Sequence, residues 1–143
     1  MICRNRRARH DYEISEEVEA GLVLMGSEVK SLRSGRADLV DGYASIKEGE
    51  LFLVSVHIAP YDKAARFGHE PKRMRKLLVQ RKVIHRFETK IRERGFTLVP
   101  LEMYFRKGWA KVLIGLAKGR KQYDNRDAIR REEDRRAARR IDD

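Results

Sequence analysis

The side chains most able to do chemistry in this sequence are cations, and the chemistry that they favour is the binding of phosphate. The 143 residues contain 33 Lys and Arg against 22 Asp and Glu, which gives a formal net charge of +11. The surplus is uneven, because residues 72–94 hold ten Lys and Arg against two Asp and Glu, whereas residues 13–50 are acidic overall. Clustered cations attract polyanions. Nucleic acid is therefore the favoured partner, although a single basic cluster is usually only a solvated surface.

The sequence offers no comparable argument for catalysis or for a bound metal. The four histidines lack the spacing of metal ligands, and no Gly-rich phosphate loop is present. Cys3 is the single cysteine, which excludes a disulfide framework and a cysteine-rich zinc site. We expect neither an enzymatic activity nor a cofactor.

Membrane association is also disfavoured. No apolar run approaches the roughly 20 residues that span a bilayer. The first ten residues, MICRNRRARH, lack the apolar centre of a signal peptide, and the basic segments lack an aromatic opposite face. We expect a protein of the reducing cytoplasm with no membrane partner.

The elements that must position these cations are mostly short strands. Residues 12–25 predict one or two strands with a turn near Ser15 and Glu16, and residues 43–58 predict a hairpin whose turn contains Gly49. Leu77, Leu78 and Val79 predict a short strand after a loop over residues 59–72. Residues 96–105 and 109–117 predict a second hairpin, in which Pro100 favours an edge position or a bulge.

Two helices flank these strands in the predicted pattern. Ser27 as N-cap and Gly35 as terminator predict a two-turn helix. Residues 81–94 place apolar side chains at helical spacing before Gly95. Six or so short strands with two helices predict a mainly β fold with flanking helices, namely a small antiparallel barrel like the oligonucleotide-binding (OB) fold.

The predicted domain organisation has three parts. Residues 1–11 form a basic N-terminal arm, residues 12–118 form the OB-like RNA-binding barrel, and residues 119–143 form a basic C-terminal tail. The tail is rich in helix formers but has no continuous apolar stripe. We expect it to be detached from the barrel and to become helical when it binds an anionic surface.

Several motifs resemble those of a known family, in the same order along the whole chain. They include Asn5-Arg6-Arg7-Ala8-Arg9-His10-Asp11-Tyr12, Gly26-Ser27-Glu28-Val29-Lys30, Arg75-Lys76-Leu77-Leu78 and Ala117-Lys118-Gly119-Arg120-Lys121. They resemble small protein B, the bacterial family that partners transfer-messenger RNA (SsrA RNA).

The resemblance implies an RNA-binding adaptor of trans-translation, the rescue of stalled ribosomes. Its barrel would bind the tRNA-like domain of transfer-messenger RNA, while its tail would occupy the decoding centre of the small ribosomal subunit and the empty mRNA channel. Elongation factor Tu, bound to the charged transfer-messenger RNA, is a further implied partner.

The resemblance also implies sites on the barrel. Asn5, Glu19 and Leu78 fall on positions that the family uses against the RNA elbow. The alternatives are that Asn5 caps a turn, that Glu19 pairs with an arginine and that Leu78 belongs to the core. The remaining candidates are cations for phosphate and rings for base stacking: Arg9, Arg73, Arg75 and Lys76, with His10 or Tyr12.

In the tail, the resemblance implies contacts to the ribosome and its decoding centre. The residues are Lys118, Arg120, Lys121, Tyr123, Asp124, Asn125, Arg126 and Ile141. The sequence departs from the family pattern at Asn125, where the family carries Lys, and at Asp134, where it often carries Trp.

Two other classes of protein remain open from the residues alone. One is a general single-strand nucleic-acid-binding or ribosome-assembly barrel, and the other is a nucleic-acid enzyme with an unrecognised site. An adaptor should prefer a structured tRNA-like elbow to an unstructured strand of equal length, whereas a general binder should not.

Overall fold

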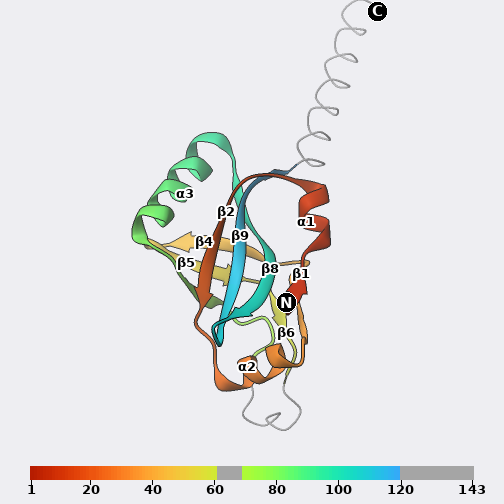
Figure 1. The fold of residues 1–143 in the computed structure, drawn as a ribbon. Helices are drawn as coiled ribbons and strands as arrows, with labels where there is room; N and C mark the ends of the chain where they lie inside the picture. The colour runs from red at the N-terminus through yellow and green to blue at the C-terminus, as the bar shows by residue number, and fades with distance from the viewer. Residues whose placement is uncertain (61–68, 120–143) are drawn as a thin grey trace, which may run out of the picture.

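The computed structural model describes residues 1–60 and 69–119, which form nine strands and three helices. The strands are β1 (Cys3–Arg4), β2 (Tyr12–Leu22), β3 (Ala37–Asp38), β4 (Tyr43–Lys47), β5 (Glu50–Val54), β6 (His57–Ile58), β7 (Arg75–Leu78), β8 (Thr97–Arg106) and β9 (Trp109–Gly119). The helices are α1 (Arg6–Asp11), α2 (Gly26–Arg33) and α3 (Arg81–Arg94). Figure 1 shows α3 and α2 at opposite ends of the strands, with α1 beside them.

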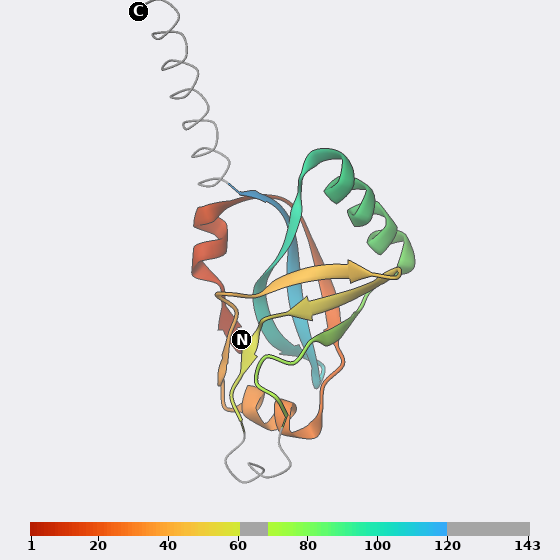
Figure 2. The ribbon, with the colours of Figure 1, turned by 180° about the vertical axis from the view of Figure 1, so that it is seen from behind.

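Six of the strands close into a barrel. Their order is β8-β4-β5-β7-β2-β9, and β9 pairs back with β8, so the ring has no free edge. All of these pairs are antiparallel. The short strand β1 adds to β8, and β3 and β6 form a separate two-stranded sheet. The expected fold class, a small antiparallel OB-like barrel with flanking helices, is confirmed; Figure 2 shows the same barrel from behind.

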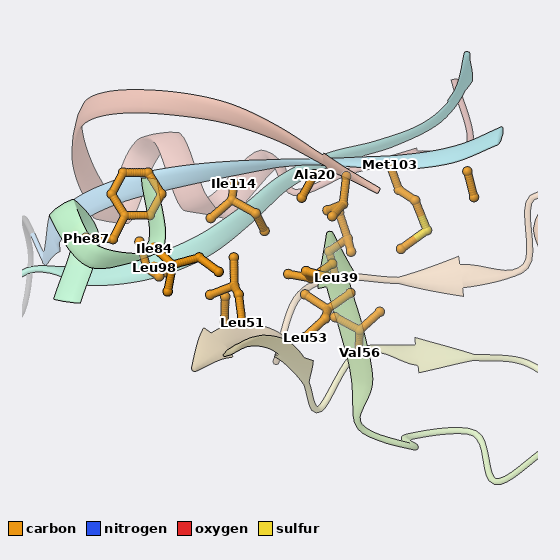
Figure 3. Close-up of a cluster of buried hydrophobic side chains, with 14 of the residues drawn as sticks. Ala20, Leu39, Leu51, Leu53, Val56, Ile84, Phe87, Leu98, Met103 and Ile114 are labelled. Carbon is orange, nitrogen blue, oxygen red and sulfur yellow. The ribbon is translucent and has the colours of Figure 1, made fainter. Parts of the chain in front are cut away.

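The helix α3 covers one end of the barrel because its apolar face points into the core. Ile84 and Phe87, three residues apart on that face, are buried, and Figure 3 shows both beside Leu98 and Leu51 of the strands. The helix ends where Gly95 adopts the left-handed conformation, with φ of 68°. The helix predicted from apolar spacing over residues 81–94 is confirmed at both ends.

Both predicted hairpins form, and each closes through a two-residue turn; the first ends at Val54, because His57 and Ile58, included in its predicted range, form β6 and pair with β3. Glu48 and Gly49 join β4 to β5 with φ of 52° and 75°, and Lys107 and Gly108 join β8 to β9 with φ of 51° and 81°. Two consecutive positive φ angles match the right-handed twist of the strands. Pro100 lies at a register shift in the pairing of β8 with β9, which is the bulge alternative.

Two local predictions are corrected. The chain does not turn at Ser15 and Glu16, because β2 continues through them and absorbs an irregularity as a bulge in its pairing with β9. Ser27 is not the N-cap of α2, since the cap position is Met25, whose backbone N–H donates to the Glu28 carboxylate at 2.8 Å. The Ser27 hydroxyl is instead 2.9 Å from Nδ1 of the buried His69.

The first eleven residues contain structure that the sequence analysis did not anticipate. Residues of β1 pair with Glu102 and Met103 of β8, and Asn5 then caps α1 by accepting the backbone N–H of Ala8 at 3.2 Å. Ala8 is buried against the barrel. This segment is therefore folded onto the strands. None of the helices that the structure describes has the length and apolar character needed to cross a membrane.

Candidate nucleic-acid interface

The predicted RNA-binding residues of the barrel fall into two separate groups. Strand β2 carries Tyr12 at its start and Glu19 seven residues later, a separation of about 23 Å along an extended strand. Arg9, His10 and Tyr12 lie together at the first end of β2. Glu19 and Leu78 lie toward the other end, where Gly21 pairs with Leu78. The structure thus does not combine them into one site.

The group at the start of β2 lies where the barrel passes into the tail. Tyr12 pairs with Gly119 at the end of β9, so Lys118 is close to this group. Arg9 forms an ion pair with Glu17 at 2.8 Å, and His10 is exposed with Nδ1 3.1 Å from Asp11. The Lys118 ammonium stands 5.0 Å above the Phe96 ring. Tyr12 is half-buried and packs against the small cluster around Ala8, so its ring is only partly available for stacking.

The second group lies on the outside of four neighbouring barrel strands. Side chains alternate between the two faces of a strand, so Lys76 and Leu78 share the outer face of β7 while Arg75 and Leu77 point inward. Across the sheet, the residues on the same outer face are Glu19 on β2, Lys111 on β9, and Tyr104 and Arg106 on β8. We call Lys76, Leu78, Glu19, Lys111, Tyr104 and Arg106 the outer-sheet face.

Glu19 is held in one orientation on the outer-sheet face. The Tyr104 hydroxyl donates to its Oε2 at 2.6 Å, and Nη1 of Arg106 donates to the same oxygen at 3.1 Å. The hydrogen bond from Tyr104 is the main reason that the pKa of Glu19 lies below its ordinary value, and Arg106 and Lys111 lower it further. Burial and the Glu19 carboxylate raise the pKa of Tyr104 to about 12. Glu19 therefore remains an acceptor at neutral pH, and the alternative pairing with an arginine is present.

An apolar groove of about 660 Å³ runs beside the outer-sheet face. Leu78 and Trp109 line it and are 56% and 73% exposed, and the partly exposed Val23 lies between β2 and α2 in its wall. An exposed aromatic ring such as that of Trp109 can stack on an unpaired base, and an exposed aliphatic side chain such as Leu78 can pack against one. The alternative that Leu78 belongs to the core is excluded by its exposure.

Arg75 requires a correction. It was expected to contact a phosphate, but its side chain is fully buried. Its Nε donates to Glu28 at 2.5 Å, and its terminal nitrogens donate to the carbonyl oxygens of Val56 and Pro71. Because each of its three side-chain nitrogens donates inside the fold and the side chain has no exposed surface, Arg75 anchors α2 to β7 and is not available to RNA.

Glu28 is the buried acid at the centre of this anchor. Its Oε1 accepts both from Arg73 and from the backbone N–H of Met25, while its Oε2 accepts from Arg75. Burial alone raises the pKa of Glu28, but the hydrogen bonds from Arg73, Met25 and Arg75 outweigh it and leave the pKa below its ordinary value. Arg73 keeps one third of its side chain exposed, so it can bind Glu28 and still present charge to solvent.

Two further candidates also have partners in the fold. Lys76 is exposed and forms an ion pair with Glu50 at 3.0 Å, which leaves it accessible. Asn5 is buried, and its Nδ2 donates to the carbonyl oxygens of Pro100 and Leu39 while its Oδ1 caps α1. These bonds support the alternative in which Asn5 caps a turn.

Residues for metal or thiol chemistry do not gather within the part of the chain that the structure describes. There, no three His, Cys, Asp or Glu side chains come together in a group able to hold a metal ion. Cys3 is half-buried, and burial together with the charge of Asp38 raises the pKa of its thiol to about 11.

Sequence reasoning missed Trp109, Tyr104 and Arg106. Trp109 immediately follows the turn at Lys107 and Gly108, and an aromatic residue at the tip of a hairpin is a local signal of exposure. No local signal places Tyr104 on Glu19, since the two are 85 residues apart. The tail candidates Arg120, Lys121, Tyr123, Asp124, Asn125, Arg126 and Ile141 lie outside the described residues.

Comparison with known proteins relates this interface to a family. The family model described as SmpB protein matches residues 2–143. The SsrA-binding protein of Enterococcus faecalis (strain ATCC 700802 / V583) is 54% identical over 133 residues, which cover 93% of this chain and 86% of that protein. The SsrA-binding protein of Symbiobacterium thermophilum is 57% identical over 129 residues, which cover 90% of this chain and 82% of that protein.

A solved structure is also similar to the barrel. One of its chains is 50% identical to this chain, with a TM-score of 0.70, and the match covers 83% of this chain and 84% of that one. The structure is described as "tmRNA-SmpB: a journey to the center of the bacterial ribosome". Since the family model spans nearly the whole chain and the relatives share more than half of its residues, the chain belongs to the SmpB protein family.

Proposed function

We propose that this protein is an RNA-binding adaptor of trans-translation in the cytoplasm. It binds the tRNA-like domain of transfer-messenger RNA and delivers that RNA to stalled ribosomes. The names of its relatives, which are SsrA-binding proteins, and the similarity to an SmpB chain described with tmRNA and the ribosome support this function. The observation that carries it is the outer-sheet face, where exposed Leu78 and Trp109 line a groove beside the oriented Glu19.

The chemistry of this face suits a folded RNA loop. Trp109 offers a flat aromatic surface to a base that has left its stack, and Leu78 offers an apolar contact beside it. Glu19 uses Oε2 for Tyr104 and Arg106, so Oε1 is left to accept from an exocyclic amine or a 2′-hydroxyl. Lys76 and Lys111 supply positive charge for neighbouring phosphates. Because such contacts require a base held in a fixed place, they favour a structured elbow.

The group at the start of β2, beside the end of β9, is the second part of this proposal. Arg9 and His10 lie near the end of β9, where Lys118 is the first of the residues that the resemblance assigns to the ribosome. Arg9 and His10 contact the transfer-messenger RNA together with the outer-sheet face, and Lys118 contacts the ribosome. Elongation factor Tu joins the complex through the charged RNA. The role requires no catalysis by the protein itself.

The test compares two RNAs of equal length, a transcript of the tRNA-like domain and an unstructured strand. The protein should bind the folded transcript more tightly at moderate salt. Equal affinity would favour the alternative, a general single-strand-binding or ribosome-assembly protein. Multiple turnover of either RNA would reopen the case for an enzyme.

Single substitutions refine this test. Trp109→Ala should weaken binding of the tRNA-like domain about 5- to 150-fold, which corresponds to about 1–3 kcal/mol for one stacked base. Val40→Ala is the control, because Val40 is 48% exposed but lies off the outer-sheet face. If both variants bind as the wild type does, the groove does not hold a base.

A further inference from the structure

The exposed side of α3 carries a row of cations outside the outer-sheet face. Lys82, Arg86 and Lys90 are spaced four residues apart, so they lie one turn above another on one side of the helix. Successive members are separated by about 6 Å along the helix axis. This separation is comparable to the distance between neighbouring phosphates of one nucleic-acid strand. The buried face of the same helix is formed by Ile84 and Phe87.

The contacts of α3 show which way this row faces. Arg86 forms an ion pair with Glu16 of β2, so the row lies on the side of α3 that is turned toward β2. The opposite side faces β4 and β5, because Arg81 lines a pocket with Gly49, and Arg92 lines another with residues of β4. Strand β2 also carries Glu19, and Lys82 follows Leu78 by only four residues. The row therefore lies next to β2 at the rim of the barrel that α3 covers, because Glu16 shares the inner face of β2 with Val18 and Ala20, whereas Glu19 lies on the outer face.

The row contains charge that the fold does not use. Four other cations of residues 72–94 have acidic partners, in the pairs Arg73–Glu28, Arg75–Glu28, Lys76–Glu50 and Arg92–Glu88. Within residues 1–60 and 69–119, neither Lys82 nor Lys90 forms an ion pair. Like charges four residues apart on a helix repel each other and destabilise it slightly. An external anion would remove that repulsion, whereas Glu16 neutralises only Arg86.

We propose that Lys82, Arg86 and Lys90, at the rim of the barrel, bind the phosphate backbone of the folded RNA whose loop is held on the outer-sheet face. Lys82 and Lys90 each contact a phosphate with an ammonium group. Glu16 positions Arg86, whose guanidinium has enough N–H donors to bind the carboxylate and a phosphate together. This inference rests on the proposed function, because the row acts only if a folded RNA occupies the outer-sheet face.

The test uses two double variants of the full chain that remove the same charge from the same helix. Lys82→Ala/Lys90→Ala removes the row but keeps the Arg86–Glu16 pair, and Arg81→Ala/Arg92→Ala removes two cations from the opposite side. All four positions are exposed or partly exposed, and alanine favours helix, so both variants should fold. Affinity for a transcript of the tRNA-like domain is measured over a series of salt concentrations.

The row variant should bind more weakly and should lower the slope of log affinity against log salt by about 1.4–1.8, since each neutralised phosphate contributes about 0.7–0.9. The control variant should keep the slope of the wild type. Equal loss in both variants would mean general attraction by net charge, and no loss in either would mean that the row does not touch RNA; both results overturn the inference. If the wild type itself does not prefer the folded transcript, it is the proposed function that fails.

Discussion

At the scale of single residues, two neighbouring cations of β7 differ completely in their exposure to solvent. Arg75 is fully buried against Glu28, whereas Lys76 is exposed and pairs with Glu50 at the surface. The alternation of side chains along β7 accounts for the difference. A basic run in the sequence therefore contains two kinds of residue: buried cations that stabilise the fold and exposed cations that can bind RNA.

Removing Arg75 should unfold the protein more readily than removing Lys76. Arg75→Ala should lower the free energy of unfolding by about 3–5 kcal/mol, because it leaves the buried Glu28 carboxylate without the partner of its Oε2 and leaves a buried carbonyl oxygen without its donor. Lys76→Ala should cost less than about 1 kcal/mol, because exposed ion pairs contribute little. Urea denaturation of both variants measures this difference. Similar midpoints for the two variants would contradict the assignment of Arg75 as an anchor.

The lowered pKa of Glu28 predicts that the free energy of unfolding depends on pH in the acidic range. A carboxylate whose pKa is lower in the folded state stabilises the protein above its unfolded pKa, about 4.3, and this contribution is lost as the pH falls through the folded pKa. Denaturation midpoints should therefore decline as the pH drops below about 4.3. In Glu28→Gln, which is less stable at neutral pH, this part of the decline should be absent. An equally steep decline in the variant would assign the effect to other carboxylates.

At the scale of elements, each end of the barrel depends on a helix that supplies core side chains. α3 inserts Phe87, which is fully buried, beside Leu98 and Leu51 (Figure 3). The helix is otherwise highly charged, so few of its residues hold it to the strands. Its place on the barrel rests on this narrow apolar face.

Phe87→Ala should therefore destabilise the whole barrel and not only α3. The loss should be about 3–5 kcal/mol, the range seen when a large buried ring leaves a cavity. Thr89→Ala is a suitable control, because Thr89 is exposed on the same helix. Thermal unfolding followed by circular dichroism compares the two. A small effect of Phe87→Ala would mean that the end of the barrel can close without the helix.

At the scale of the whole molecule, the candidate contacts divide between two regions of the barrel. The outer-sheet face gathers Leu78, Glu19 and their neighbours from β7, β2, β9 and β8, while Arg9, His10 and Lys118 lie where β9 leads into the tail. An adaptor that binds two partners at once needs separate surfaces of this kind.

Ending the chain after Gly119 should separate these two roles. Gly119 is the last residue of β9 and pairs with Tyr12, so the barrel keeps all of its strands. Binding of the tRNA-like domain should stay within a few-fold of the wild type, while tagging on stalled ribosomes should be abolished. Gel-shift and reconstituted tagging assays measure the two activities. A comparable loss in both would show that the tail also belongs to the RNA site.

The sequence by itself determined the local elements and the class of ligand. Apolar spacing placed α3, turn residues such as Gly49 and Gly108 placed the hairpins, and the excess of Lys and Arg indicated a polyanion. These features depend on residues close together in the chain, which is why they could be predicted. The turn expected at Ser15 failed because a bulge, which the strand pairing absorbs, produces the same break in pattern.

Only the tertiary structure decided which of the many charges are available and what surrounds them. Glu28 meets Arg75 across 47 positions of the chain, and Tyr104 meets Glu19 across 85. Such pairs arise from the register of the strands and from the packing of α2 against them. They determine which cations are buried and stabilise the fold, and which remain exposed and can bind RNA. The physical reason is that burial and long-range partners are properties of the packed barrel, whereas composition and spacing record only what each segment prefers alone.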